Sequence, residues 1–314
     1  MTEHSAHLPH VVWVDDTPSL WSRLLDALIR MVGRRRQWAS ASAVHARLRR
    51  LARRPASHRP SGMRRGVKAT LRAAEGWPVY HVEPRDGRAA HRHVVFLHGG
   101  GYINEIVRTH WRFVDYLTAR AHAHCVVPIY PLAPRGTAAD VVPAAGRLLR
   151  EVLETLGPEN VTVIGNSAGA GLALAATQWL RDGGFSRPKG LVLISPALDA
   201  TMDYSEQAAI AANDVMQDIP GLAEAMRLYA GGLEIAHPFV SPLNGNLHDL
   251  PAMTVFTSTF DLFYPDSVAL SHKAARAGVP IEMYVRSGLP HNYALLPTPE
   301  GREARDIIAR LVAE

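Results

Sequence analysis

Cysteine and lysine are unusually scarce in this sequence. Cys125 is the single cysteine among 314 residues, which excludes an intramolecular disulfide framework and any paired-cysteine metal or redox motif. Lysine occurs three times, so arginine carries nearly all the positive charge. The longest uncharged stretch, residues 160–180, contains three glycines and several polar side chains, so we do not interpret it as a membrane span. The first ten residues lack the basic-then-apolar pattern of a signal peptide, and we expect a soluble cytoplasmic protein.

Charge is distributed unevenly along the chain. Residues 1–93 hold 18 basic and 7 acidic side chains, whereas residues 94–314 hold 16 basic and 22 acidic ones. Hydrophobic residues make up 47% of the sequence, which is enough for a substantial core and excludes disorder of the whole chain. We therefore expect a basic helical N-terminal segment over residues 1–60, followed by a large folded domain.

Two helices are predicted in the basic segment. The first begins with Thr17 as its N-cap and Pro18 as its first residue, and its leucines recur at helical spacing up to Val32. The second runs from about Ser40 to Arg54. We expect the apolar face to pack on the rest of the protein while the arginines meet solvent; the alternative is a peripheral membrane contact. In the packed arrangement, four large side chains would line a substrate pocket: Trp13, Trp21, Met31 and Trp38.

Strands and helices alternate in the rest of the chain. Short apolar runs predict strands at Val67–Ala73, Val79–Glu83, Val94–Leu97, Cys125–Tyr130, Val161–Ile164, Leu191–Ile194, Met253–Thr257 and Ile281–Val285. Helical patterns predict helices at Trp111–Ala121, Val141–Leu156, Ala168–Arg181, Ser267–Ala277 and Arg302–Val312. This alternation indicates βαβ units, and therefore an α/β fold with a mostly parallel central sheet flanked by helices.

The strongest motif is Gly165-Asn166-Ser167-Ala168-Gly169, a G-x-S-x-G sequence between a buried strand and a helix. A serine in this context lies on a sharp turn with its hydroxyl exposed above the sheet, where it can act as a nucleophile. The flanking glycines allow neighbouring backbone to approach the turn closely. An accidental turn of the same sequence is the alternative, because short motifs recur by chance.

A second motif, His98-Gly99-Gly100-Gly101, directly follows a predicted strand. Consecutive glycines leave backbone N–H groups free to point into a pocket, and such donors stabilise the oxyanion of a tetrahedral intermediate. A phosphate loop is the alternative, but the lysine of the G-x-x-x-x-G-K-[ST] pattern is absent. We interpret His98 and Gly101 as support for the loop, and His98 as a hydrogen-bonding residue rather than a base.

An acidic residue and a histidine follow the last two predicted strands. Asp261 and His291 both belong to loops at the strand ends, where ligands bind in parallel sheets. The chain order Ser167, Asp261, His291 is that of the α/β-hydrolase triad. His291 would accept and return the proton of Ser167, and Asp261 would orient the imidazole. Asp266 is a competing acid, which we interpret as a capping or first-turn residue of the next helix.

Together these residues resemble the hormone-sensitive-lipase-like (HGGG-type) branch of α/β-hydrolase carboxylesterases. The fragments Tyr130–Pro134, Ser195–Asp199 and Ser241–Leu243 add to the resemblance, which covers roughly residues 65–314. It implies an α/β-hydrolase fold with a catalytic domain over residues 61–314. It also implies a helical cap, built from residues 1–60 and an insert at about residues 200–235.

The resemblance further implies a mechanism. Ser167 would form an acyl-enzyme, and the backbone N–H groups of Gly99, Gly100 and Ala168 would form the oxyanion hole, with no metal or organic cofactor. We expect an esterase or lipase acting on small or medium acyl esters. A lactone or amide hydrolase of the same fold, and a non-catalytic ligand-binding relative, are the alternatives. The aspartate that commonly precedes the serine in this family is replaced by Asn166.

The remaining clusters predict no further chemistry. His122 and His124 form the densest histidine cluster but lack the spaced partner of a metal site, so we expect them to flank a strand. The arginine clusters lack interleaved aromatic side chains, so we expect no nucleic-acid partner. We expect a small-molecule ester as substrate and a monomer or a homodimer. Three further histidines are expected in a mobile end: His4, His7 and His10.

Overall fold

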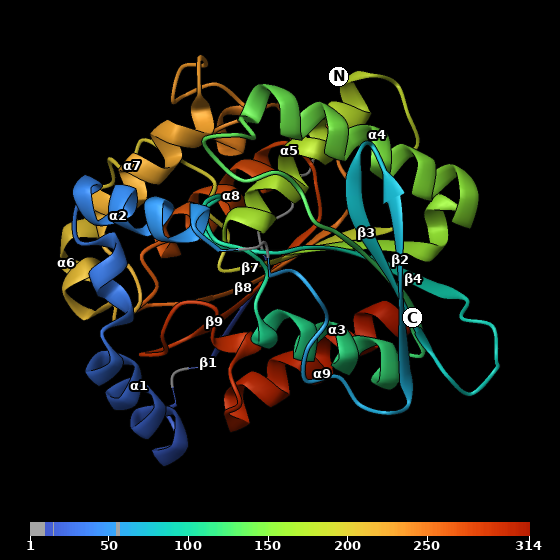
Figure 1. Cartoon of the computed structure of the whole chain (residues 1–314), viewed down its shortest axis with the longest axis horizontal. Coiled ribbons are helices and arrows are strands. Elements are labelled where there is room, and N and C mark those ends of the chain that lie inside the picture. Colours follow the sequence, from blue (N-terminus) through green and yellow to red (C-terminus); the bar gives the residue numbers. More distant parts are fainter. Residues whose placement is uncertain (1–9, 15, 55–56) are drawn as a thin grey trace.

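A nine-stranded sheet organises the computed structural model, which describes residues 10–14, 16–54 and 57–314 (Figure 1). The strands lie in the order β1-β9-β8-β7-β6-β4-β5-β3-β2. Their bounds are His10–Val14 (β1), Val67–Ala74 (β2), Trp77–Pro84 (β3), Arg92–Leu97 (β4), Ala123–Pro128 (β5), Val161–Asn166 (β6), Gly190–Ile194 (β7), Met253–Ser258 (β8) and Ile281–Arg286 (β9). Strand β3 pairs antiparallel with β2 and β5, and every other pairing is parallel. The predicted α/β fold with a mostly parallel sheet is therefore confirmed.

Strand β1 was not expected from the sequence. It pairs in parallel with the outer edge of β9, from His10 opposite Glu282 to Val14 opposite Arg286. The expectation that His10 lies in a mobile end is wrong, because the otherwise unpaired backbone of β9 gives this short segment hydrogen-bonding partners. The other two histidines of that prediction, His4 and His7, fall outside the described residues.

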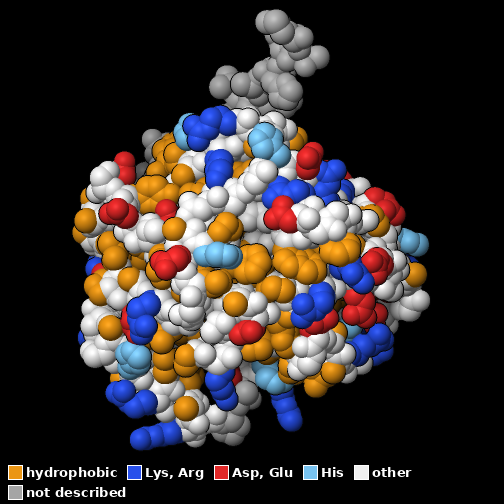
Figure 2. Space-filling view, turned by 90° about the horizontal axis from the view of Figure 1, so that it is seen from above, with side chains coloured by type: hydrophobic (Ala, Val, Ile, Leu, Met, Phe, Trp, Pro, Cys, Tyr) orange, Lys and Arg blue, Asp and Glu red, His pale blue; other side chains and the backbone are white. Residues whose placement is uncertain are grey.

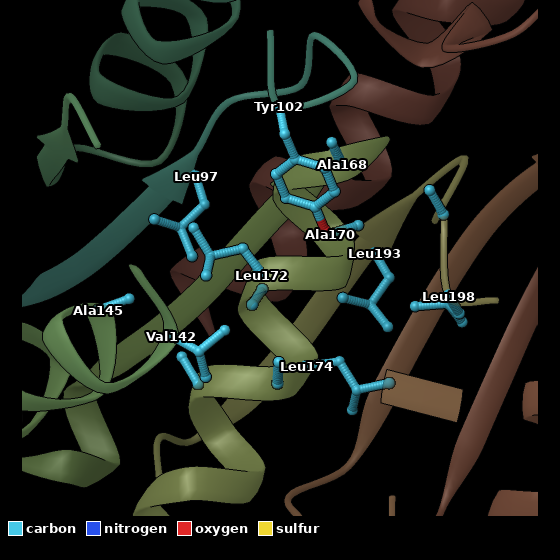
Figure 3. Close-up of a cluster of buried hydrophobic side chains, with 14 of the residues drawn as sticks. Leu97, Tyr102, Val142, Ala145, Ala168, Ala170, Leu172, Leu174, Leu193 and Leu198 are labelled. Atoms are coloured by element: carbon cyan, nitrogen blue, oxygen red, sulfur yellow. The ribbon is translucent and has the colours of Figure 1, made fainter. Parts of the chain in front are cut away.

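Helices cover both faces of the sheet, as Figure 1 shows. Helices α4, α5 and α8 pack on one face and α3 and α9 on the other, each with its own hydrophobic core. Their bounds are Arg108–Arg120 (α3), Ala138–Leu156 (α4), Ala168–Asp182 (α5), Tyr264–Arg276 (α8) and Pro299–Ala313 (α9). In Figure 3, side chains of α4 and α5 meet those of β4 and β7, including Val142, Leu172, Leu97 and Leu193. The buried strands therefore carry apolar side chains toward both layers.

The N-terminal helices and the insert after β7 pack against each other. The N-terminal part comprises α1 (Leu20–Val32), the 3₁₀ helix η1 (Arg34–Trp38) and α2 (Ala41–Ala52); the insert comprises α6 (Gln207–Asn213) and α7 (Ile219–Ala230). Gly221 lies so close to Trp38 that a Cβ atom on it would be 2.3 Å from the Trp38 backbone. Arg35 also pairs with Asp218 at 3.0 Å. Figure 2 views the molecule from the side of α4 and α7; hydrophobic side chains gather over the middle of this face.

Helix α1 differs from its sequence prediction in two ways. It begins at Leu20 rather than Pro18, because the Ser19 side chain accepts the Ser22 N–H and caps the helix. Its apolar face does not pack on the body as expected. Six apolar side chains of α1 are exposed by between 48% and 75%: Leu20, Trp21, Leu24, Leu28, Met31 and Val32. Within the described residues, no helix has the length and apolar character to cross a membrane.

Candidate active site

Ser167 lies on a strained turn between β6 and α5. Its φ of 54° and ψ of −126° are rare for a residue with a side chain. The two motif glycines permit this turn, because their neighbours leave no room for a Cβ atom. A Cβ on Gly165 would lie 2.3 Å from the Gly169 carbonyl oxygen, and one on Gly169 would lie 2.1 Å from that of Leu97. The turn thus holds Ser167 at the end of β6, with α5 starting directly behind it.

The structure brings Ser167, His291 and Asp261 into one hydrogen-bonded row. His291 Nε2 lies 2.9 Å from Ser167 Oγ, and its Nδ1 lies 2.9 Å from Asp261 Oδ1. All three residues are buried, and each follows the carboxyl end of a strand, β6, β8 or β9. In this arrangement the imidazole can accept the serine proton while the carboxylate fixes its tautomer.

Two carboxylates raise the pKa of the His291 imidazole. Burial lowers the pKa of His291, but the hydrogen-bonded Asp261 and the nearby Asp214 outweigh it and raise the pKa above the usual value. Asp214 precedes α7 in the insert and is itself buried. Burial and the Asp261 charge raise the pKa of Asp214 to about 6. Its side chain accepts the N–H groups of Met216, Gln217 and Leu262, so it ties the insert to the loop that carries Asp261.

Asp266, the competing acid, does not contact His291. It lies in the first turn of α8, as expected, but its Oδ2 accepts the N–H groups of Leu198 at 2.6 Å and Asp199 at 2.9 Å. Complete burial raises the pKa of Asp266 well above its usual value. Its contacts therefore hold the start of the insert rather than the imidazole.

The glycine loop departs from the expectation at Gly99. The Gly99 N–H donates to Asn166 Oδ1 at 2.9 Å, so it is not free to donate to an oxyanion, and the predicted role of Gly99 is corrected. Asn166 Nδ2 in turn donates to Asn292 Oδ1 at 3.2 Å. This fully buried amide therefore connects the glycine loop, the Ser167 turn and the residue after His291.

Three other backbone N–H groups belong to the same part of the site: Gly100 and Gly101 line the pocket together with Ser167, and Ala168 follows Ser167 directly. Within the described part of the chain, no side chain or carbonyl accepts a hydrogen bond from the N–H of Gly100, Gly101 or Ala168. Gly100 and Gly101 have φ values of 141° and 59°, which favour glycine. A Cβ on Gly100 would lie 2.5 Å from the Asn104 carbonyl oxygen, so the loop closes tightly on itself. These groups are the available donors for an oxyanion.

His98 is buried beneath the glycine loop. Its Nδ1–H donates to the Gly99 carbonyl at 2.9 Å, and its ring stacks on Tyr130 with centroids 4.5 Å apart. The Tyr130 hydroxyl donates to the His98 carbonyl. Burial lowers the pKa of His98 to about 4, so the ring is neutral near pH 7. These contacts brace the loop, and none of them reaches Ser167.

A pocket of about 350 Å³ opens above Ser167 and His291. Part of its apolar lining comes from the N-terminal helices and the insert, through Leu25, Ile29, Trp38, Met216 and Leu222, and part from the segment after His291, through Leu295, Leu296 and Pro297. Trp38 was expected here. The prediction for the other three large side chains is wrong, because Trp13, Trp21 and Met31 are exposed on the outer surface. Leu25 and Ile29, one helical turn apart on α1, line the pocket instead.

The histidine cluster splits in the structure. His122 Nε2 lies 3.1 Å from Asp86 Oδ2, whereas His124 contacts His81 and His93 on the neighbouring strands. Across residues 10–14, 16–54 and 57–314, no group of three or more potential ligands is arranged to hold a metal ion.

Comparison with known families identifies the group to which this site belongs. A family model described as alpha/beta hydrolase fold matches residues 94–295, which include the glycine loop and all three residues of the hydrogen-bonded row. The chain belongs to the α/β-hydrolase family. It is 33% identical to a triacylglycerol lipase of Mycobacterium tuberculosis over 72% of its length, and 31% identical to an acetyl-hydrolase of Streptomyces hygroscopicus over 71%. It spans about half the length of the lipase, 47%, and 76% of the acetyl-hydrolase.

Solved structures indicate to which branch of the α/β-hydrolase family this chain is similar. A hormone-sensitive lipase from a metagenome library superposes with a TM-score of 0.81 at 26% identity, covering 95% of this chain and 99% of the other. A homologue of hormone-sensitive lipase, EstE7, also from a metagenome library, matches with the same TM-score and coverage at 25% identity. The hormone-sensitive-lipase-like resemblance and the esterase/lipase class of hydrolase are therefore confirmed.

Proposed function

We propose that this hydrolase cleaves carboxylic esters through an acyl-enzyme formed on Ser167. The observation that carries the proposal is the row from Ser167 Oγ through His291 to Asp261, with both contacts at 2.9 Å, beneath an apolar pocket. His291 Nε2 accepts the serine proton as Oγ attacks the ester carbonyl carbon. The resulting imidazolium is stabilised by Asp261 and then protonates the departing alcohol.

The second half of the reaction returns the enzyme to its starting state. Water enters, His291 accepts its proton, and the hydroxide attacks the acyl carbon. The tetrahedral intermediate collapses, the carboxylic acid leaves, and Ser167 regains its proton from His291. In both halves the oxyanion accepts hydrogen bonds from backbone N–H groups, for which we assign Gly100, Gly101 and Ala168. Each such donor typically contributes about 3–4 kcal/mol to lowering the barrier.

The residues above Ser167 act as a cap that selects the acyl chain. The volume of about 350 Å³ lies near the lower end for ligand pockets and suits small or medium esters. Ile29 of α1 lines this pocket, whereas Leu24 of the same helix points away from it. Ile29→Ala should therefore shift the preferred ester toward longer chains. Leu24→Ala is the matched control, and an equal shift in both variants would contradict the cap assignment.

Hydrolysis of lactones and amides passes through the same kind of tetrahedral intermediate as hydrolysis of esters. Comparing these substrates therefore tests which leaving group is preferred, not which mechanism operates. A non-catalytic binding protein of this fold would not need three residues in continuous hydrogen-bond contact. The arrangement of the row thus favours an enzyme. A matched series of an ester, a lactone and an anilide with the same acyl group should give the highest kcat/KM for the ester.

Ser167→Ala tests the nucleophile directly. Removing the hydroxyl should lower kcat on a short p-nitrophenyl ester by about 10⁶-fold, while circular dichroism and thermal unfolding stay close to the parent. Ser205→Ala, at an exposed serine of the insert, is the control and should keep full activity. A Ser167→Ala protein that retains most of its turnover would refute the proposed function.

A further inference from the structure

Helix α1 presents an apolar face that no other part of the described structure covers. Six of its thirteen residues form this outer face, which we call the α1 face: Leu20, Trp21, Leu24, Leu28, Met31 and Val32. At helical spacing these six positions fall within an arc of about 120°. A contiguous exposed patch of large apolar side chains is uncommon on soluble proteins and marks an interaction surface.

Hydrogen bonds hold the start of the helix on the side opposite the α1 face. The Glu300 carboxylate accepts three hydrogen bonds from the start of α1: the N–H of Ser19 at 2.6 Å, its hydroxyl at 3.1 Å, and the Ser22 hydroxyl at 2.6 Å. Leu25 and Ile29 line the pocket above Ser167. The same helix therefore has one edge at the pocket and one face toward the outside. In Figure 1, α1 lies at the margin of the molecule.

Arginines lie along one side of the α1 face and just beyond the end of the helix. Residues 20–54 contain ten arginines and a single acidic residue, Asp26. Arg23 and Arg30 lie on the polar side of α1, and Arg34 and Arg36 follow its last turn; all four are exposed. Large apolar side chains bordered by arginines match an interface in which acyl chains lie beneath negatively charged headgroups.

We propose that α1 docks this enzyme onto an anionic phospholipid surface, with the α1 face inserted at the boundary between headgroups and acyl chains. A second copy of the chain fits less well, because a two-fold contact would place the arginines of one copy against those of the other. A docked α1 would also hold the pocket edge formed by Leu25 and Ile29 at the lipid surface. The docking itself does not depend on the proposed chemistry.

Binding to vesicles tests this proposal. The protein should sediment with vesicles of equal parts phosphatidylcholine and phosphatidylglycerol, more weakly with phosphatidylcholine alone, and less as salt increases. The double variant Trp21→Ser and Met31→Ser should lose at least about tenfold in vesicle affinity, because it removes the two most exposed large side chains of the face. Leu71→Ser on β2 is the matched control, since Leu71 is 53% exposed and remote in sequence from α1.

Further measurements separate the outcomes. The surface variants at Trp21 and Met31, at Leu71, and at Arg23 and Arg30 should hydrolyse a soluble short ester at the parental rate, which shows that they fold. Arg23→Gln with Arg30→Gln should weaken binding and flatten its salt dependence without changing any core residue. The Ser167→Ala protein should bind vesicles like the parent, so that a failure of the proposed chemistry is distinguishable from a failure of docking. Equal vesicle binding by the Trp21/Met31 double variant, or a dimer in light scattering that this variant dissociates, would overturn the proposal.

Discussion

The loops at the carboxyl edge of the sheet and the N-terminal helices border the same pocket, but they are held in different ways. Around Ser167, backbone and side chains are tied at short range: Gly169 touches the Leu97 carbonyl, and Asn166 bonds to Gly99 and Asn292. Helix α1 is instead attached through the Glu300 carboxylate at its start and through apolar contacts at the pocket. The first region is built for fixed geometry, and the second for contact with variable ligands.

This difference predicts which property each region controls. Substitutions in the strand-end loops should lower kcat, since they move the reacting groups. Substitutions in the N-terminal helices should change stability, substrate size or surface binding while the chemistry persists. The following substitutions test that division.

After Ser167→Ala, the largest effect is expected at Asp261. Asp261→Asn keeps the shape of the side chain but loses the charge that orients and stabilises the imidazolium, so kcat should fall by about 10⁴-fold. The measurement is steady-state kinetics on a soluble ester. Asp266→Asn is the matched control and should act mainly on folding, because Asp266 bonds to the backbone of Leu198 and Asp199. If Asp266→Asn lowered kcat more than Asp261→Asn did, the acid that pairs with His291 would have to be reassigned to Asp266.

Trp38 sharpens the contrast within the N-terminal segment. Trp38→Ala removes a buried indole between the body and the insert and should lower the free energy of unfolding by about 3–5 kcal/mol. Trp21→Ala, on the exposed side of α1, should change it by at most about 0.5 kcal/mol. Urea denaturation measures both values. If both variants lowered the free energy of unfolding by similar amounts, the N-terminal segment would not be held by the Trp38 contacts described above.

Asn166 should influence the rate without contacting substrate. Asn166→Ala breaks the bonds to Gly99 and Asn292 in a buried site, which we expect to lower kcat by roughly 10–100-fold, from about 1–3 kcal/mol of lost positioning. KM should change little, since the side chain supports the loops rather than the acyl chain. Asn166→Asp can still accept the Gly99 N–H and should recover part of the rate. An effect confined to KM would contradict this role.

The smallest effect concerns pH. His291 must be neutral to accept the Ser167 proton, so activity falls as the pH drops through its pKa. The Asp214 charge helps to raise that pKa, so Asp214→Asn should shift the acidic limb of kcat/KM to lower pH. Asp218→Asn, which pairs with Arg35 instead, should leave the limb in place. An acidic limb that is unmoved, or moved to higher pH, in Asp214→Asn would contradict the coupling.

The sheet and the hydrogen-bonded row were largely predictable from the sequence. Apolar runs such as Val161–Ile164 gave the strands to within about two residues. The motifs at Ser167, Asp261 and His291 each follow a strand, and parallel strands bring such residues to one edge. Periodicity and motif spacing depend on the local sequence and on the order of the strands, so they can be read without knowing how side chains pack.

What could not be predicted depends on which groups meet across the fold. Gly99 looks the same in sequence as Gly100, but the three-dimensional approach of Asn166 occupies its N–H. Strand β1 depends on a vacant sheet edge rather than on its own pattern. The apolar stripe of α1 was visible, but helical periodicity does not say which arc faces the body. Leu25 and Ile29 face inward, whereas Leu24 and Leu28 do not.

Trp38 has a consequence for how this enzyme can be re-engineered. A Cβ atom on Gly101 would lie only 2.5 Å from the Trp38 ring, and the Trp38 backbone packs against Gly221. The N-terminal segment, to which we assign the selection of the acyl chain, is thereby packed directly against the glycine loop beside Ser167. If the N-terminal part were replaced by that of another esterase, we expect the specificity to change cleanly only when the new segment has an equally large ring at the position of Trp38. With a smaller side chain there, the glycine loop would lose its packing partner and become less well ordered.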